Sequence, residues 1–127
     1  MAKSISAEQF MREKDAQWQK RETFVTIDES RLGHSFWRRV AWTFHQQHNM
    51  TDKVFVIERL QLTSAEPTSS QSAPDLSLIG AIQYRIGYWI VYTNGVWGWG
   101  RNSPLVPIED FEPLLAKARQ AGTILPS

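Results

Sequence analysis

The dipeptide Asn94-Gly95 lies between two segments rich in aromatic and β-branched residues, and this feature constrains the fold most. Asn-Gly is favoured in the two-residue type I′ turn that joins antiparallel strands, because both of its residues adopt positive φ there. We therefore expect a β-hairpin in which a strand over 77–93 pairs with a strand over 96–101. A two-residue turn would place Tyr92 opposite Trp97.

Side chains alternate between the two faces of a strand, so the hairpin predicts two different surfaces. The first surface would carry a row of large apolar side chains: Ile82, Tyr84, Ile86, Tyr88, Ile90, Tyr92, Trp97 and Trp99. The second would carry Arg85 and Trp89, with Trp89 opposite Gly100. The first surface is suited to a core beneath a helix, whereas the second is open to a ligand or a partner.

The remaining segments predict helices and two further strands. Ser6 and Gln9 form a capping box ahead of a helix over 7–20, and a last helix begins at Pro107 and ends at Gly122. Residues 23–27 and 53–62 have the β-branched content of strands. Four apolar residues spaced by four predict a helix from about 28 to 48: Leu32, Phe36, Val40 and Phe44.

These elements follow the order α-β-α-β-loop-β-β-α, which is typical of the α+β class. We expect one domain over 1–127, with a small antiparallel sheet of about four strands and helices covering one face. Residues 64–76 are rich in Ser, Thr and Pro and contain no aromatic residue. This composition predicts a flexible loop.

Composition excludes several classes of protein. The chain has no cysteine, which rules out disulfides, thiol catalysis and thiolate zinc sites. Residues 1–19 contain many charges and no apolar export signal, and no segment approaches eighteen apolar residues, so we expect a cytoplasmic protein without a membrane partner. The net charge of +1 is too small for a protein that coats duplex DNA by its field alone.

The segment from Tyr84 to Ala118 resembles a pattern seen in small bacterial proteins without an assigned activity. In that pattern a strand reads R-x-G-Y-[YW], a hairpin ends in W-x-W-G, and P-x-[IV]-P-x-E-D-[FL] opens the last helix. The matching residues here are 85–89, 97–100 and 104–111, within a segment that covers roughly a quarter of the chain. The resemblance implies a shared unit of hairpin and helix, and it transfers no site. Arg101-Asn102 departs from the polar-aromatic pair that is commoner in the pattern.

Five residues are candidates for ligand binding. Arg85, Trp89 and Arg101 combine guanidinium and ring groups in the hairpin, which suits stacked bases with phosphates beside them. Arg38 and Trp42 belong to a basic stripe along the predicted central helix, together with Arg31 and His45. Core packing of the hairpin aromatics and a solvated helix face are the structural alternatives.

We also considered catalysis and metal binding. His45 and His48 would lie one turn apart on the predicted helix, where Asp52 could complete a metal site. Glu58 and Asp28 are the acids that a metal-dependent nuclease would use, but pairing of Glu58 with an arginine, or exposure of Glu58 at a sheet edge, explains its position more fully.

The hypothesis from sequence is a non-enzymatic binding module whose favoured ligand is single-stranded nucleic acid. No catalytic residue, metal or cofactor is predicted. The alternatives are a protein-interaction or regulatory subunit that docks through its aromatic surface, a metal-dependent hydrolase or nuclease, and a small-molecule pocket between sheet and helix. A homo-oligomer is compatible with all of these.

Overall fold

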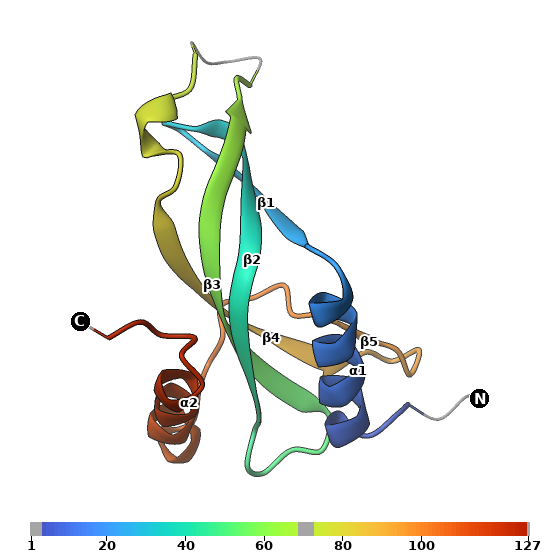
Figure 1. Cartoon of the computed structure of the whole chain (residues 1–127). Coiled ribbons are helices and arrows are strands. Elements are labelled where there is room, and N and C mark those ends of the chain that lie inside the picture. The colour runs from blue at the N-terminus through green and yellow to red at the C-terminus, as the bar shows by residue number, and fades with distance from the viewer. Residues whose placement is uncertain (1–3, 69–72, 127) are drawn as a thin grey trace.

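The computed structural model describes residues 4–68 and 73–126, and its centre is a single antiparallel sheet. The five strands are neighbours in the sheet in the order of the chain: β1 (Phe24–Glu29), β2 (Gly33–Gln46), β3 (Lys53–Glu66), β4 (Ile82–Val91) and β5 (Trp97–Trp99). Helices α1 (Ala7–Lys20) and α2 (Ile108–Gln120) and the short 3-10 helix η1 (Leu76–Leu78) complete the fold (Figure 1). The α+β class is therefore confirmed, with a fifth strand and a different element order.

Both predicted terminal helices form at the predicted caps. The backbone N–H of Gln9 donates to the Ser6 hydroxyl at 3.1 Å, which satisfies one of the free donors at the start of α1. Helix α2 ends with Gly122 at a φ of 78°, and the N–H of Thr123 returns to the carbonyl of Ala118 at 2.9 Å. No helix among the described residues has the length and apolar character needed to cross a membrane.

The two helices cover opposite faces of the sheet, which corrects the expectation that they share one face. Phe10 of α1 packs with Val54, and Leu114 of α2 packs with Phe55. Consecutive strand residues point to opposite faces, so Val54 and Phe55 mark the two sides. Figure 1 shows the helices on either side of the lower half of β2, while the upper half of the sheet extends beyond both of them.

The helix predicted over 28–48 is wrong, because this segment forms most of β2. A spacing of four residues is even, so it also keeps side chains on one face of a strand. The register with β3 shifts twice: between Phe36 and Trp37, where the extra residue is Thr63 of β3, and between Arg39 and Ala41, where the shift hides the alternation of β2. The second shift leaves Val40 as an extra residue and moves the inward face from odd to even positions.

The hairpin forms, but its predicted register is off by one residue. Trp89 pairs with Trp99 and Val91 pairs with Trp97, so all three tryptophans share one face. Only glycines have positive φ among the described residues, and Gly95 at 79° follows a turn closed by its N–H donating to Tyr92 at 2.8 Å. The connection is therefore a three-residue loop ending in a left-handed glycine, which replaces the expected type I′ turn.

The segment predicted as a flexible loop is partly ordered. Strand β3 continues to Glu66, and η1 occupies Leu76–Leu78, where Leu78 packs against a core cluster that contains Trp37. Residues 69–72 of the predicted loop lie outside the described residues.

Candidate functional site

A hollow of about 550 Å³ lies where the chain passes from α1 into β1 beside β2. We call it the α1–β2 hollow, and its lining residues are Trp18, Gln19, Arg21, Glu22, Arg38, Arg39, Val40 and Trp42. Two of the five candidate binding residues, Arg38 and Trp42, are therefore brought together, although by a strand and not by the predicted helix. The lining contains three arginines and one glutamate, so the hollow is cationic.

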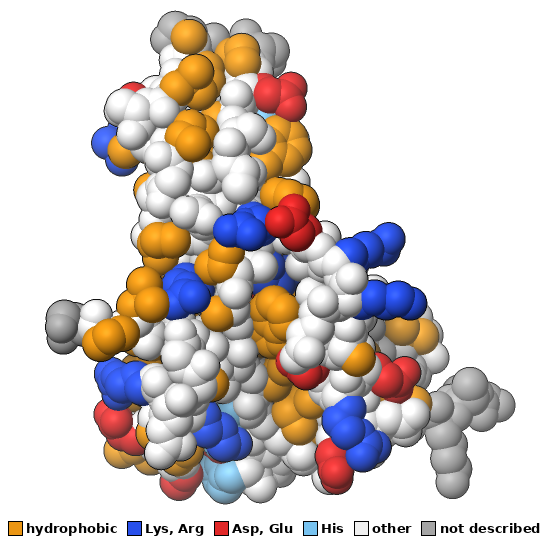
Figure 2. All heavy atoms as spheres, viewed as in Figure 1, with side chains coloured by type: hydrophobic (Ala, Val, Ile, Leu, Met, Phe, Trp, Pro, Cys, Tyr) orange, Lys and Arg blue, Asp and Glu red, His pale blue; other side chains and the backbone are white. Residues whose placement is uncertain are grey.

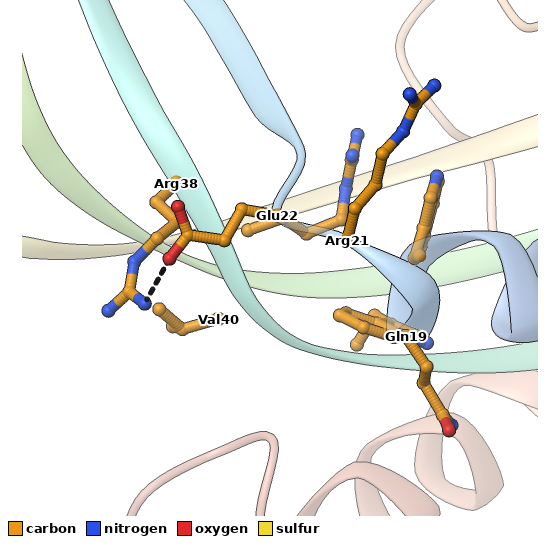
Figure 3. A pocket seen from close by; sticks show the side chains of 8 residues that line it. Gln19, Arg21, Glu22, Arg38 and Val40 are labelled. Atoms are coloured by element: carbon orange, nitrogen blue, oxygen red, sulfur yellow. Dashed lines mark hydrogen bonds and ion pairs between the residues drawn. The ribbon is translucent and has the colours of Figure 1, made fainter.

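The three arginines of the hollow differ in how they are held. Arg38 donates to Glu22 at 3.4 Å and to Gln61 at 3.0 Å, and Figure 3 shows the Arg38–Glu22 pair beside the more extended Arg21. Arg21 is exposed and has no ion pair with any of the described residues. Arg21 therefore has the guanidinium most accessible to an anionic ligand.

The aromatic wall of the hollow offers little free ring surface. Trp18 is buried, with the guanidinium carbon of Arg39 at 3.9 Å from its ring centroid. Trp42 is half-buried, meets Trp18 edge-on at 5.5 Å, and donates its indole N–H to Asp15 at 2.8 Å. Trp42 is thus the one tryptophan of this wall that keeps accessible surface for a planar group.

Behind the hollow, a buried carboxylate joins β2, β3 and β4. Glu58 is fully buried; Arg39 donates its Nε–H to one carboxylate oxygen, and Arg85 donates to the other at 2.7 Å. The Arg85 guanidinium also lies 4.4 Å from the Trp99 ring centroid. Pairing of Glu58 with an arginine is confirmed and its exposure at an edge is wrong. Arg85, a candidate for ligand binding, is engaged within the fold.

The carboxylate of Glu58 is not placed for metal-assisted hydrolysis with Asp28. Asp28 bonds to His34 at 2.5 Å at the far end of β1, whereas Glu58 pairs in register with Trp42. Trp42 follows His34 by eight positions along β2, which is a span on the order of 25 Å. Among the described residues, no group of three or more His, Asp or Glu side chains could hold a metal ion.

The hairpin tryptophans pack against α1. Trp97 stacks on Phe10 at 4.5 Å and donates its indole N–H to the carbonyl of Ile5 at 2.9 Å. Trp89 lies 5.4 Å from both Phe10 and Trp99, and the ammonium of Lys14 lies 4.4 Å above its ring. The face that we expected to be open to a ligand is therefore the face that α1 covers.

The fifth candidate residue, Arg101, lies apart from the others. It is exposed and lines a separate, shallow hollow of about 320 Å³ at the tip of the hairpin. Arg101 therefore does not contribute to the α1–β2 hollow.

A second polar cluster joins α2 to the turn between β2 and β3. The carboxylate of Asp110 is buried and accepts from His45 Nε2 at 2.8 Å, from His48 Nδ1 at 2.6 Å and from the backbone N–H of His48 at 3.0 Å. The ammonium of Lys117 lies 3.0 Å from His45 Nδ1, which leaves that nitrogen as the acceptor. His45 and His48, the two histidines considered as metal ligands and not predicted to be so, thus meet at a carboxylate on a helix that the sequence did not link to them.

The Asp110 cluster should make stability depend on pH in both directions. Burial alone would raise the pKa of Asp110, but the hydrogen bonds from His48 and His45 outweigh it and lower that pKa. The hydrogen bond to Asp110 raises the pKa of His48. The stability that Asp110 contributes to the fold should therefore be present above pH ~4 and be lost as the pH falls through its lowered pKa. The stability that His48 contributes should be complete below pH ~6.5 and be lost as the pH rises through its raised pKa.

We expect this cluster to stabilise the fold most between those limits, and the Asp110→Asn variant to lose both dependences. NMR titration of the His48 ring would test this directly, because its pKa should fall to its ordinary value in Asp110→Asn. Asp28→Asn, which removes the carboxylate partner of His34 instead, is the matched control and should leave the pKa of His48 unchanged. An unchanged His48 pKa in Asp110→Asn would contradict the proposed coupling.

Comparison with protein-family models, with curated proteins and with solved structures finds no match to this chain. The resemblance of the hairpin and α2 to a bacterial sequence pattern therefore stays a prediction, and the site must be interpreted from its own geometry.

Sequence reasoning missed three residues that the structure places in these clusters: Arg21, Arg39 and Asp110. The adjacent Arg38-Arg39 pair was a usable signal, because a strand must send two consecutive side chains to opposite faces and one of them can reach a buried acid. Asp110 carried no such signal, since an acid in a first helical turn is already explained by the helix dipole.

Proposed function

We propose that this protein is a non-enzymatic binding module that holds the backbone of single-stranded nucleic acid in the α1–β2 hollow. The observation that supports this most is the convergence of Arg21, Arg38 and Arg39 on one hollow beside Trp42. Guanidinium groups next to one accessible ring are the combination that single-strand binding uses.

The charge distribution favours a short contact over an extended one. Figure 2 shows Lys and Arg side chains in several separate groups on this face, with no continuous basic track. Arg39 is already neutralised by Glu58, so about two arginines are available to phosphates. Binding should therefore be weak to moderate and depend on only a few phosphates.

Titration of the folded protein with fluorescently labelled oligo-dT, followed by anisotropy, tests this proposal. We expect log affinity to fall with log salt concentration with a slope of about −1.4, as for two phosphates on a single strand. Arg21→Ala and Arg38→Ala should each weaken binding by about tenfold, the equivalent of one charged hydrogen bond.

Arg12→Ala is the matched control, because Arg12 is an exposed arginine of α1 that pairs with Glu8 outside the hollow. Its affinity and salt slope should equal those of the wild type. Equal losses in Arg12→Ala and Arg21→Ala would show that binding follows net charge and not the hollow. No binding to any oligonucleotide by the folded protein would overturn the proposal.

A protein partner is the second candidate function, and one surface favours it. Leu105 and Ile108 are 81% and 85% exposed, and Phe111 follows on the same side at the start of α2. Apolar side chains this exposed mark interaction surfaces when they are contiguous. If oligonucleotides do not bind, this surface is the next to test.

A further inference from the structure

The first half of β4 forms an edge of the sheet that no described strand covers. Strand β5 pairs with β4 only at residues 89–91, and the last contact along this edge is the N–H of Gly100 donating to the carbonyl of Tyr88 at 2.8 Å. Residues 82–87 therefore have a partner, β3, on one side only. Natural proteins usually protect such an edge, because its free backbone groups pair with other chains.

The backbone groups that face outward belong to the even-numbered residues of β4. The N–H of Leu62 in β3 donates to Ala81 at 3.0 Å, and Val91 donates to Asp52 at 3.1 Å, so the odd-numbered residues bond inward. Hydrogen-bonding direction alternates along an antiparallel strand. The outward groups are therefore those of Ile82, Tyr84 and Ile86.

The side chains of the same three residues form an exposed apolar row, which we call the β4 stripe. Ile82, Tyr84 and Ile86 are 41%, 44% and 39% exposed. They point to the face that α2 covers lower down, at Tyr88, but they lie beyond the reach of the helix. Figure 2 shows hydrophobic side chains along the left flank of the molecule, where Figure 1 places the first half of β4, with Lys and Arg side chains among them. An apolar edge with free backbone groups predicts a strand partner.

The sequence of the stripe is symmetric about Tyr84. The side chains of the stripe follow the order Ile, Tyr, Ile, and this order is the same in either direction along the strand. Two copies that run antiparallel therefore present identical rows to each other. Pairing with an identical strand would place Ile82 opposite Ile86 and Tyr84 opposite Tyr84, all with their backbone groups directed across the edge. A two-fold axis through Tyr84 satisfies both chains at once, which is the self-complementarity that a closed dimer requires.

The opposite edge of the sheet, formed by β1 and by the part of β2 that β1 does not reach, does not have this property. Beyond the extra residue Val40, β2 has no β1 partner, and its residues Trp42 and Phe44 contact Trp18 of α1. Its sequence is not symmetric, and both helices flank it (Figure 1).

We infer that the protein forms a symmetric homodimer in which the β4 edges of two copies pair antiparallel about Tyr84, making one continuous sheet. The occupant of the edge is a second copy of this chain. This inference is independent of the α1–β2 hollow, which lies between the end of α1 and β2, toward the opposite edge of the sheet.

A charge introduced at Tyr84, which would lie on the two-fold axis, tests the dimer, and the opposite charge on the second copy should restore it. Sedimentation velocity over a dilution series should show a dimer for the wild type and for Tyr84→Phe, which loses only the bond between the Tyr84 hydroxyl and the N–H of Leu125. Tyr84→Lys and Tyr84→Glu should each weaken dimerisation at least about tenfold, because like charges meet on the axis. An equal mixture of these two variants should recover the dimer, with a mass by native mass spectrometry that contains one copy of each.

A second pair of variants keeps the test valid if position 84 is needed for folding. Ile82→Lys and Ile86→Glu should be monomeric alone and dimeric when mixed, since these positions face each other across the axis. A monomeric wild type, an assembly larger than a dimer, or dimers that persist in Tyr84→Lys and Tyr84→Glu would each overturn the inference. In the last case a different surface, such as the one around Ile108, would hold the copies together.

Discussion

Glu58→Gln should be among the most destabilising single substitutions in this protein, lowering the free energy of unfolding by about 3–5 kcal/mol. The carboxylate of Glu58 is fully buried and is shared by Arg39 and Arg85. Neutralising it leaves the guanidinium of Arg39, which is almost fully buried, and that of Arg85, which is partly buried, without a countercharge. Domains of this size are stable by only about 5–15 kcal/mol, so urea denaturation should show a large shift in midpoint.

The exposed pair of Glu22 and Arg38 provides a matched control for this prediction. Glu22→Gln makes the same chemical change in a pair whose side chains are 66% and 36% exposed, and exposed pairs contribute about 0–1 kcal/mol. A second control replaces the whole cluster: Glu58→Leu combined with Arg39→Met and Arg85→Met should recover much of the stability, since no charge is then buried. Equal effects of Glu58→Gln and Glu22→Gln would contradict the role assigned to the buried carboxylate.

The sequence predicted most reliably the elements whose signals are local. The capping box at Ser6 and the terminal glycine Gly122 act through neighbouring backbone groups, so their helices could be located without tertiary information. Strand β2 could not be assigned in this way. Its apolar residues satisfy both a helical and an extended period, and the extra residue Val40 interrupts the alternation that would have decided between them.

The same distinction explains the candidate site. Asn94-Gly95 predicted a hairpin correctly, but the length of its loop decides the register, and a shift of one residue exchanges the faces of Trp97 and Trp99. Close packing fixes the observed register: a Cβ on Gly100 would overlap the ring of Tyr88. Likewise Arg38 and Trp42 were predicted to act together for the wrong reason, because their meeting depends on where α1 ends beside β2.

Trp89→Ala should destabilise the fold by about 3 kcal/mol, the lower end of the range for a tryptophan lost from a packed site. The Trp89 ring contacts Phe10 and Trp99 and lies beneath the Lys14 ammonium, so its removal would open a cavity between α1 and the sheet. The effect should appear in the free energy of unfolding measured with urea. Trp89→Phe should recover part of the loss, because a smaller ring still fills the space between Phe10 and Trp99.

Oligonucleotide affinity separates this structural role from the stacking role that the sequence alone suggested. Measured in the absence of denaturant, where the variant stays folded, the affinity of Trp89→Ala for oligo-dT should equal that of the wild type. Arg101→Ala is the control at the same hairpin: its exposed side chain should change the unfolding free energy by less than ~0.5 kcal/mol. If Trp89→Ala instead kept full stability and lost a stacking contribution of about 1–3 kcal/mol, bases would be reaching Trp89. In that case α1 would have to move away from the sheet when the ligand binds, because its Phe10 now occupies one side of the ring.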